Sequence, residues 1–114
     1  MTDCIFCKIV NKQIPATIVH QDDAVTAFRD INPQAPTHIL IVPNQHIGGA
    51  AQLTRDHGAM LASLYTTAAR LAETDGIAES GYRLVINEGP NAGQSVFHLH
   101  LHLLGGRRLG WPPG

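Results

Sequence analysis

The chain has 114 residues, of which 44% are hydrophobic and 15% are charged, and its formal net charge is -1. This length predicts a single domain over residues 1–114, and a charge so close to neutral excludes the broad electrostatic attraction that nucleic-acid binding requires. No apolar run is long enough to span a membrane and the N-terminus lacks the pattern of a signal peptide, so we expect a cytoplasmic protein with neither a membrane nor a nucleic acid as partner.

Cys4 and Cys7 are the two cysteines of the chain, and they lie in a short helical turn predicted over residues 4–10. A disulfide is implausible in the reducing cytosol, and a redox pair normally opens a helix that follows a buried strand. The spacing suits two ligands of a tetrahedral zinc ion, which needs two more ligands. The alternative is that both cysteines are small, buried apolar residues.

Two short runs rich in β-branched residues follow, at 17–21 and 24–29, and the Asp-Asp pair between them predicts a hairpin. Residues 32–36 contain two prolines and predict a loop. Residues 38–42 form an apolar run typical of a central strand, which Pro43 ends.

A helix is predicted from Thr54, whose hydroxyl can cap free N–H groups, to Gly76. Its apolar residues recur at helical spacing and predict a face for the core or for another subunit: Leu61, Leu64, Tyr65, Ala68, Leu71 and Ala72. Residues 82–87 and 97–104 predict a fourth and a fifth strand. The order of these elements predicts an α+β fold, an antiparallel five-stranded sheet with one long helix and a short N-terminal helix.

His98, His100 and His102 alternate with leucines in the last predicted strand. Because successive side chains of a strand point to opposite faces, this period places the three imidazoles on one face and the leucines on the other. Imidazoles have polar edges that need partners and titrate near neutral pH. We therefore expect the three histidines to form either a metal cage or a catalytic array.

The loop of residues 88–95 leads directly into the histidines and contains two glycines. Glycine lets backbone N–H groups converge on an oxyanion. Ser95 stands three residues before His98, and this position indicates a phosphate site more specifically than a glycine-containing turn would by itself. Loop and strand together predict a phosphate site.

Residues 93–103 resemble the signature of the histidine triad superfamily. Other segments, which extend the match over nearly the whole chain, resemble its branch of nucleotide-binding proteins: Ile5-Phe6-x-Lys8-Ile9, Ile14-Pro15-Ala16, Ala27-Phe28-x-Asp30-Ile31, Pro33-Gln34-Ala35-Pro36-Thr37-His38, Val42-Pro43, His46-Ile47, Gly105-Gly106-Arg107 and Trp111-Pro112-Pro113-Gly114. The resemblance implies a HIT-like fold and a homodimer.

The resemblance also implies that His100 is the nucleophile that attacks phosphorus and carries the nucleotide. One ring nitrogen then attacks while a backbone carbonyl holds the other as N–H. His102 and His98 would flank the phosphoryl oxygens, whose charge the loop N–H groups offset. Ser95 would hydrogen-bond the phosphate or the leaving amine, and His38 would support a proton relay.

For the nucleoside, the resemblance places Asp30 on the ribose hydroxyls and Phe6 and Ile31 beside the base. Asn87 would approach the phosphate or the ribose. The predicted nucleotide-binding set is completed by the loop and the triad: Gly93, Gln94, Ser95, His100 and His102. Without the resemblance, Phe6 and Ile31 would fit equally well in an ordinary core, and Asp30 in a turn.

Some histidine triad proteins and the related hexose-phosphate uridylyltransferases complete a pair of cysteines with a histidine after the third strand and the first triad histidine. Here these are His46 and His98, so the resemblance implies a closed, structural zinc site of Cys4, Cys7, His46 and His98. No cofactor is implied for the chemical step. If zinc takes one nitrogen of His98, that residue orients the site more than it contacts phosphate.

The predicted function is hydrolysis of the P–N bond of purine nucleoside 5'-phosphoramidates, of the adenosine 5'-monophosphoramidase type, through a covalent nucleotidyl-histidine. The ligand would be an AMP-like purine nucleotide. The pattern of residues 89–94 also fits the dinucleoside polyphosphate hydrolases of the superfamily, whereas Ser95 and the tail from Trp111 favour the phosphoramidase branch. Two other classes stay open: a metallohydrolase with zinc on the three triad histidines, and a protein that binds metal or senses nucleotides without turnover.

Overall fold

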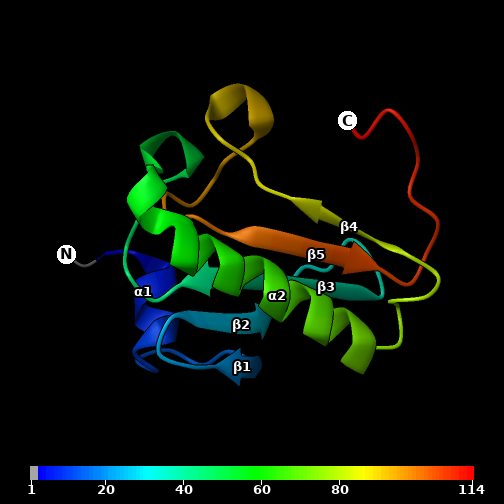
Figure 1. Ribbon diagram of the computed structural model, residues 1–114, viewed down its shortest axis with the longest axis horizontal. Helices are drawn as coiled ribbons and strands as arrows, with labels where there is room; N and C mark the ends of the chain where they lie inside the picture. Colours follow the sequence, from blue (N-terminus) through cyan, green and yellow to red (C-terminus); the bar gives the residue numbers. More distant parts are fainter. Residues whose placement is uncertain (1–2) are drawn as a thin grey trace.

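The computed structural model of the chain describes residues 3–114. Five antiparallel strands form one sheet in the order β1-β2-β3-β5-β4 (Figure 1), with the bounds β1 Ile18–Gln21, β2 Val25–Arg29, β3 Thr37–Pro43, β4 Tyr82–Val85 and β5 Leu101–Gly105. The helices are α1 (Ile5–Val10) and α2 (Gly58–Thr74), and α2 crosses one face of the sheet. The predicted fold class is confirmed.

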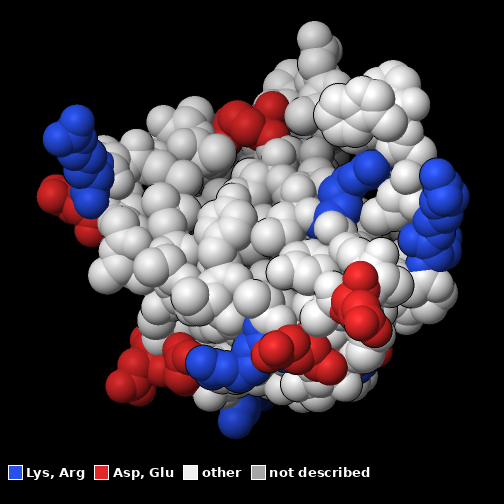
Figure 2. All heavy atoms as spheres, turned by 45° about the vertical axis from the view of Figure 1, so that its right-hand side comes forward, with Lys and Arg blue, Asp and Glu red and all other residues white. Residues whose placement is uncertain are grey.

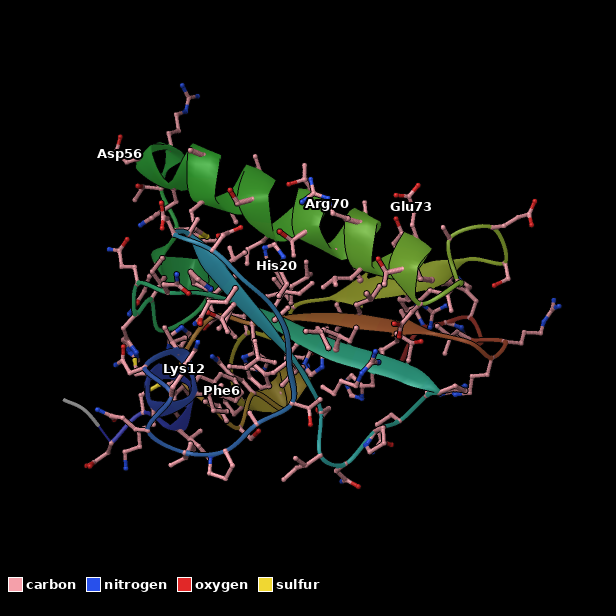
Figure 3. The ribbon with its side chains drawn as sticks, turned by 90° about the horizontal axis from the view of Figure 1, so that it is seen from below. Phe6, Lys12, His20, Asp56, Arg70 and Glu73 are labelled. Atoms are coloured by element: carbon pink, nitrogen blue, oxygen red, sulfur yellow. The ribbon has the colours of Figure 1, made fainter. Side chains whose placement is uncertain are left out.

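The central strand β3 is buried along its whole length, as its apolar sequence predicts. Ile39 and Ile41 belong to the large core under α2. Leu40 and Val42 face the other side of the sheet and pack with Phe6 of α1. Figure 3 shows Phe6 on the side of the sheet away from α2. The long helix therefore occupies one face of the sheet, and α1 packs with an apolar cluster on the other.

The helix α2 begins at Gly58 rather than at the predicted Thr54. Thr54 instead caps a 3-10 turn over Arg55–His57, where its Oγ1 accepts the Asp56 N–H at 3.3 Å and its N–H donates to Nδ1 of His57 at 2.9 Å. This reciprocal pair satisfies the free N–H groups with a tighter turn first, so the α-helix starts later. The predicted apolar face is buried at Leu64, Ala68, Leu71 and Ala72.

The strand β5 begins at Leu101 rather than at residue 97. The leucine face is as predicted, because Leu99, Leu101 and Leu103 are all buried in the core under α2. The ladder with β3 stops at Leu101 because β3 ends at Pro43, which has no N–H to donate. His98 and His100 therefore lie in an irregular segment before β5.

An ion pair joins the end of α2 to the sheet. Arg29 donates from both terminal nitrogens to the two carboxylate oxygens of Asp75, each at 2.9 Å, and the hydroxyl of Thr37 donates to the same carboxylate at 2.9 Å. The Arg29 guanidinium holds the pKa of the Asp75 carboxyl below its ordinary value. The clamp fixes the end of α2 over β2 and β3.

Charged side chains of both signs are dispersed over the face drawn in Figure 2, with no continuous basic area on that face. Arg70 and Glu73 project from α2 toward solvent (Figure 3). Within residues 3–114, no helix combines the length and the apolar character that crossing a membrane would need.

Candidate active site

His100 is held by the backbone of the triad itself. Its Nδ1 lies 2.7 Å from the carbonyl oxygen of His98, and a carbonyl can only accept, so Nδ1 carries the proton. The Nε2 atom is left with a free lone pair. The ring is 6% exposed and meets the ring of Phe6 edge to face, with the centroids 5.1 Å apart. This is the orientation that the predicted nucleophile requires.

A chain of hydrogen bonds sets the protonation of His102. The backbone N–H of Gln34 donates to Nδ1 of His38 at 3.0 Å, so a neutral His38 carries its proton on Nε2. That proton points at Nδ1 of His102, 2.9 Å away. His102 must then carry its own proton on Nε2, a buried atom with no partner among the described residues. An N–H donor is thus presented to the site and left for a ligand to accept.

Burial keeps His38 and His102, the two histidines of this hydrogen-bonded chain, neutral. Desolvation lowers the pKa of His38 below its ordinary value and lowers that of His102 to about 4. A positive charge on His100 would lower the pKa of His102 further. The carboxylate of Asp30, which lies 3.5 Å from Nε2 of His38, acts to raise this pKa. At neutral pH the pair therefore donates and accepts as neutral imidazoles.

The depressed pKa of His102 predicts that acid weakens the fold before carboxylates titrate. Between the ordinary value of 6.5 and the folded value of about 4, the unfolded chain binds a proton that the folded chain does not. The contribution of this group to the free energy of unfolding is complete above pH 6.5 and is lost as the pH falls to 4. It amounts to at most about 3 kcal/mol. Urea unfolding at pH 7, 5.5 and 4 should show this decline, and His102→Asn should make it shallower, leaving the part that comes from the lowered pKa of His38. Identical pH slopes in the two proteins would contradict the assignment.

A cavity of about 410 Å³ lies beside these histidines, between α1 and the end of β2. Six of the predicted site residues line it: Phe6, Asp30, Ile31, Ser95, His100 and His102. The side chain of Ile31 is 98% exposed, so an apolar surface stands open at the cavity. Further apolar walls come from residues to which we assigned no role from the sequence: Ile5, Ile9, Ile14, Pro15, Ala16, Phe28, Leu40 and Val96. The volume is in the usual range for small-ligand sites.

The predicted phosphate loop is built differently from expectation. Gly89 and Gly93 adopt positive φ angles of 85° and 81°, which glycine tolerates. However, the N–H groups of Gly93 and Gln94 donate within the loop, to the carbonyls of Pro90 and Gly89. Of the backbone N–H groups that follow in the chain, those of Ser95 and Val96 belong to residues that line the cavity. Asn87 follows β4 and does not line this cavity.

Gln94 joins the loop to the segment that carries His46. Its Oε1 accepts the Gly89 N–H at 2.9 Å, and its Nε2 donates to the carbonyls of Gly48 at 3.0 Å and Val96 at 3.3 Å. Both amide protons are thereby used. The side chain of Gln94 therefore braces the loop, and the place of this residue in the predicted nucleotide-binding set stays a prediction.

His98 faces away from the cavity. It is fully buried, and its Nε2 lies 2.8 Å from the carbonyl oxygen of Pro43, so Nε2 carries the proton. The lone pair of Nδ1 points at Sγ of Cys4, 3.3 Å away, and at Sγ of Cys7, 3.5 Å away. Neither nitrogen is free to reach phosphoryl oxygens in the cavity, which favours the second of the two predicted roles, in which His98 orients the site. Its carbonyl acts on the site instead, by orienting His100.

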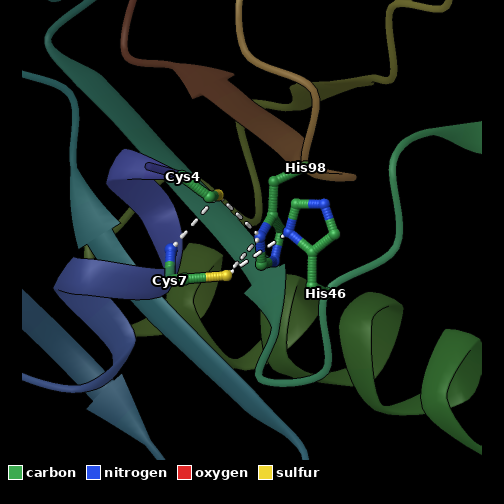
Figure 4. Close-up of side chains that lie close together, drawn as sticks. All are labelled: Cys4, Cys7, His46 and His98. Carbon is green, nitrogen blue, oxygen red and sulfur yellow. Dashed lines mark hydrogen bonds between the residues drawn. The ribbon is translucent and has the colours of Figure 1, made fainter. Parts of the chain in front are cut away.

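The four predicted zinc ligands converge at this point (Figure 4). Nδ1 of His46 lies 3.3 Å from Sγ of Cys7, and the four ligand atoms lie within 4.8 Å of one another. Two sulfurs and two imidazoles are a donor set that Zn²⁺ prefers, and tetrahedral Zn–S and Zn–N bonds place S and N roughly 3.5 Å apart. Burial and the adjacent Cys4 thiol raise the pKa of the Cys7 thiol, a cost that a bound cation would offset. The residues fit the metal.

A second cluster, of Asp30, His38 and His102, is close enough in space to hold a metal but is unsuited to one. Nδ1 of His38 accepts the Gln34 N–H, so its Nε2 presents a proton rather than a lone pair. The lone pair on Nδ1 of His102 is taken by that proton. The hydrogen bonds therefore leave the first cluster suited to a metal ion and the second suited to proton donation.

Comparison with known proteins places these features in one family. The HIT domain family matches residues 11–109. The purine nucleoside phosphoramidase of Escherichia coli K12 is 55% identical over 108 residues, which cover 95% of this chain and 91% of that protein. A 14 kDa zinc-binding protein of Zea mays is 54% identical, with 96% of this chain and 87% of that protein covered. The crystal structure of a HIT family hydrolase from Legionella pneumophila superposes with a TM-score of 0.97 at 51% identity, covering 98% of this chain and all of that one.

Proposed function

The chain belongs to the HIT domain family, and on this premise we propose that it hydrolyses purine nucleoside 5'-phosphoramidates through a nucleotide bonded to His100. It is a hydrolase of the histidine triad type, as are the relatives that it resembles over nearly its whole length. The observation that carries the mechanism is the bond from Nδ1 of His100 to the His98 carbonyl, which leaves Nε2 as a lone pair at the cavity wall.

In the first step, Nε2 of His100 forms a bond to phosphorus while the P–N bond to the amine breaks. The leaving amine takes a proton from Ser95 or from Nε2 of His102, the two donors placed at the cavity. The imidazole of His100 becomes positively charged, and the His98 carbonyl at its Nδ1 stabilises that charge. Water then attacks phosphorus and gives a proton to the group, Ser95 or His102, that lost one in the first step. The bond from phosphorus to Nε2 of His100 breaks, so the nucleoside monophosphate leaves and His100 returns to the neutral imidazole.

The nucleoside would occupy the cavity of about 410 Å³. Its apolar walls and the exposed Ile31 suit a purine base, and Phe6 contributes to these walls while its ring meets that of His100. Asp30 lines this cavity and would accept hydrogen bonds from the ribose hydroxyls. Its Oδ1 also accepts the Asn32 N–H at 2.8 Å, which fixes the carboxylate in place.

The test compares two substrate classes with the wild-type protein. We expect adenosine 5'-phosphoramidate to be cleaved to AMP with a kcat/KM far above that for diadenosine tetraphosphate, measured by chromatography of the products. Faster cleavage of the polyphosphate would assign the chain to the other hydrolase branch of the superfamily. Binding of AMP without cleavage of either substrate would make it a nucleotide sensor. Either result would overturn the proposal.

We further propose that Zn²⁺ occupies the site of Cys4, Cys7, His46 and His98 and stabilises the fold. The support is the fit of the four ligand atoms and the name of the maize relative. A bound zinc ion would tie α1 to the segment before β5 and supply no step of the reaction. The site needs free thiols, as both cysteines are here, so we propose the reducing cytoplasm as its compartment.

A homodimer is also proposed, on the evidence of the sheet edge. β4 is an edge strand, so its outer backbone N–H and C=O groups are open to another strand. Tyr82 of this strand is 37% exposed, and Tyr65 on the outer side of α2 is 45% exposed. These elements would form the contact between two copies, and sedimentation equilibrium should give twice the mass of the chain. Trp111, 83% exposed, lies in the tail that follows β5.

A further inference from the structure

Arg107 reaches back from the segment after β5 to the loop before β3. It follows β5 by two residues, and its Nε donates to the carbonyl oxygen of Gln34 at 3.0 Å, while its Nη1 donates to that of Arg108 at 3.1 Å. The preceding Gly106 also meets this loop, because a Cβ on it would lie 2.9 Å from Cβ of Pro36. The segment after β5 and the loop before β3 are therefore held together at two adjacent points.

Gln34, which Arg107 holds by its carbonyl, is also the residue that sets the protons of two site histidines. Its N–H donates to Nδ1 of His38 at 3.0 Å. With that nitrogen as acceptor, His38 directs a proton at Nδ1 of His102, and the proton of His102 lies on Nε2. Arg107 therefore stands at the outer end of a chain of hydrogen bonds that ends at the nucleoside cavity.

The opposite arrangement of protons would turn the donor of His102 into an acceptor. Without the Gln34 N–H, His38 could carry its proton on Nδ1 and a lone pair on Nε2. The proton between the two rings would then belong to Nδ1 of His102, which leaves a lone pair on its Nε2. A lone pair there repels the oxygens of a phosphate, whereas an N–H donates to them.

The other contacts of this loop anchor Asp30 rather than Gln34. The Asp30 N–H donates to the His38 carbonyl at 3.0 Å, and its carboxylate accepts the Asn32 N–H at 2.8 Å. The same carboxylate, 3.5 Å from Nε2 of His38, also favours a proton on that nitrogen. Loss of Arg107 would therefore free Gln34, shift part of the protons, and leave the Asp30 side of the nucleoside cavity in place.

We propose that Arg107 is a positioning residue, which keeps His102 as a hydrogen-bond donor to the phosphate by holding Gln34 against His38. Arg107 does not line the nucleoside cavity and acts only through these residues. The effect on the reaction rate rests on the proposed function, whereas the position of the proton on His102 does not.

The first measurement is NMR of protein labelled with heavy nitrogen in histidine, because protonated and unprotonated ring nitrogens have well-separated shifts. Arg107→Ala should move part of the His102 proton from Nε2 to Nδ1, and Gln34→Pro, which removes the N–H itself, should move more. Two matched controls should leave the proton on Nε2. Arg108→Ala removes the same charge and keeps the carbonyl, and Gln34→Ala keeps the N–H.

The second measurement compares the affinities for AMP and for adenosine, by titration calorimetry. Arg107→Ala should lower the affinity for AMP and kcat/KM for adenosine 5'-phosphoramidate by about fivefold each, the effect of one exposed hydrogen bond. Adenosine has no phosphate, so its affinity should stay unchanged. Arg108→Ala should bind both ligands as the wild type does.

An unchanged proton position on His102 in Arg107→Ala would overturn the proposal. So would an equal loss of affinity for AMP and adenosine, which would show that Arg107 shapes the nucleoside cavity. If circular dichroism shows that Gln34→Pro is unfolded, the comparison of Arg107→Ala with Arg108→Ala still decides. Failure of the proposed function is a separate result, in which the wild-type protein leaves the phosphoramidate intact wherever the His102 proton lies.

Discussion

Replacing His100 by alanine is expected to lower kcat/KM for adenosine 5'-phosphoramidate by about 10⁴-fold and to abolish the covalent nucleotidyl adduct. The reason is that Nε2 of His100 is the lone pair at the cavity that is not already used in a hydrogen bond or turned toward the cysteines. Removing a nucleophile leaves only the residual effect of binding and charge stabilisation. Acid quenching with radiolabelled substrate, followed by separation of protein from nucleotide, measures the adduct directly.

His20→Ala is the matched control for this experiment. His20 is paired with Asp22 at 2.8 Å on the hairpin, outside the nucleoside cavity and outside the hollow lined by Cys4, Cys7 and Phe97. Its removal should therefore change neither the rate nor the adduct. An adduct of equal amount on His100→Ala would place the nucleophile elsewhere. An unchanged kcat/KM in the same variant would exclude covalent catalysis by this residue.

Removing the metal is expected to lower the midpoint of thermal unfolding by about 10 °C or more while the isolated chemical step survives. A ligand present at a thousandfold excess over its Kd stabilises a fold by about 4 kcal/mol. In a chain of this size each kcal/mol corresponds to roughly 4 °C. Differential scanning calorimetry of protein with and without chelator measures the shift, and adduct formation assayed well below the lowered midpoint measures the chemistry.

His46→Ala should reproduce the effect of the chelator, because it removes one ligand that is exposed and lies outside the nucleoside cavity. His20→Ala is again the matched control, with unchanged metal content by mass spectrometry. The rival metallohydrolase predicts the opposite result: prompt, metal-reversible loss of the adduct or of turnover while the fold stays intact. A midpoint that chelation does not move would contradict a structural metal.

A moderate loss of rate without metal is consistent with the same geometry. The ring of His98 faces the cysteines, while its carbonyl orients His100. Greater mobility of the His98 ring would make its carbonyl more mobile. The hydrogen bond that fixes the tautomer of His100 would then be weaker. His98 would therefore link the proposed metal site to the proposed reaction without taking part in it.

Much of the fold was accessible from local patterns. The alternation of leucines after residue 97 predicted the buried face of β5, and the apolar run of residues 38–42 predicted a central strand. The errors arose where one segment depends on another far away. β5 starts late because its partner strand ends at Pro43, and α2 starts late because His57 completes a cap with Thr54.

For the candidate site, too, some features follow from the sequence and others from contacts between distant segments. By itself the sequence determined which residue types are present and, through the resemblance, predicted nine residues around a nucleotide and four around a metal. Six of the nine line the cavity. Only the tertiary structure decided what each nitrogen does, because a tautomer is set by whichever group lies next to the ring. The Gln34 N–H directs the proton of His102 through His38, and the Pro43 carbonyl turns the lone pair of His98 toward Cys4, 94 positions away in the chain.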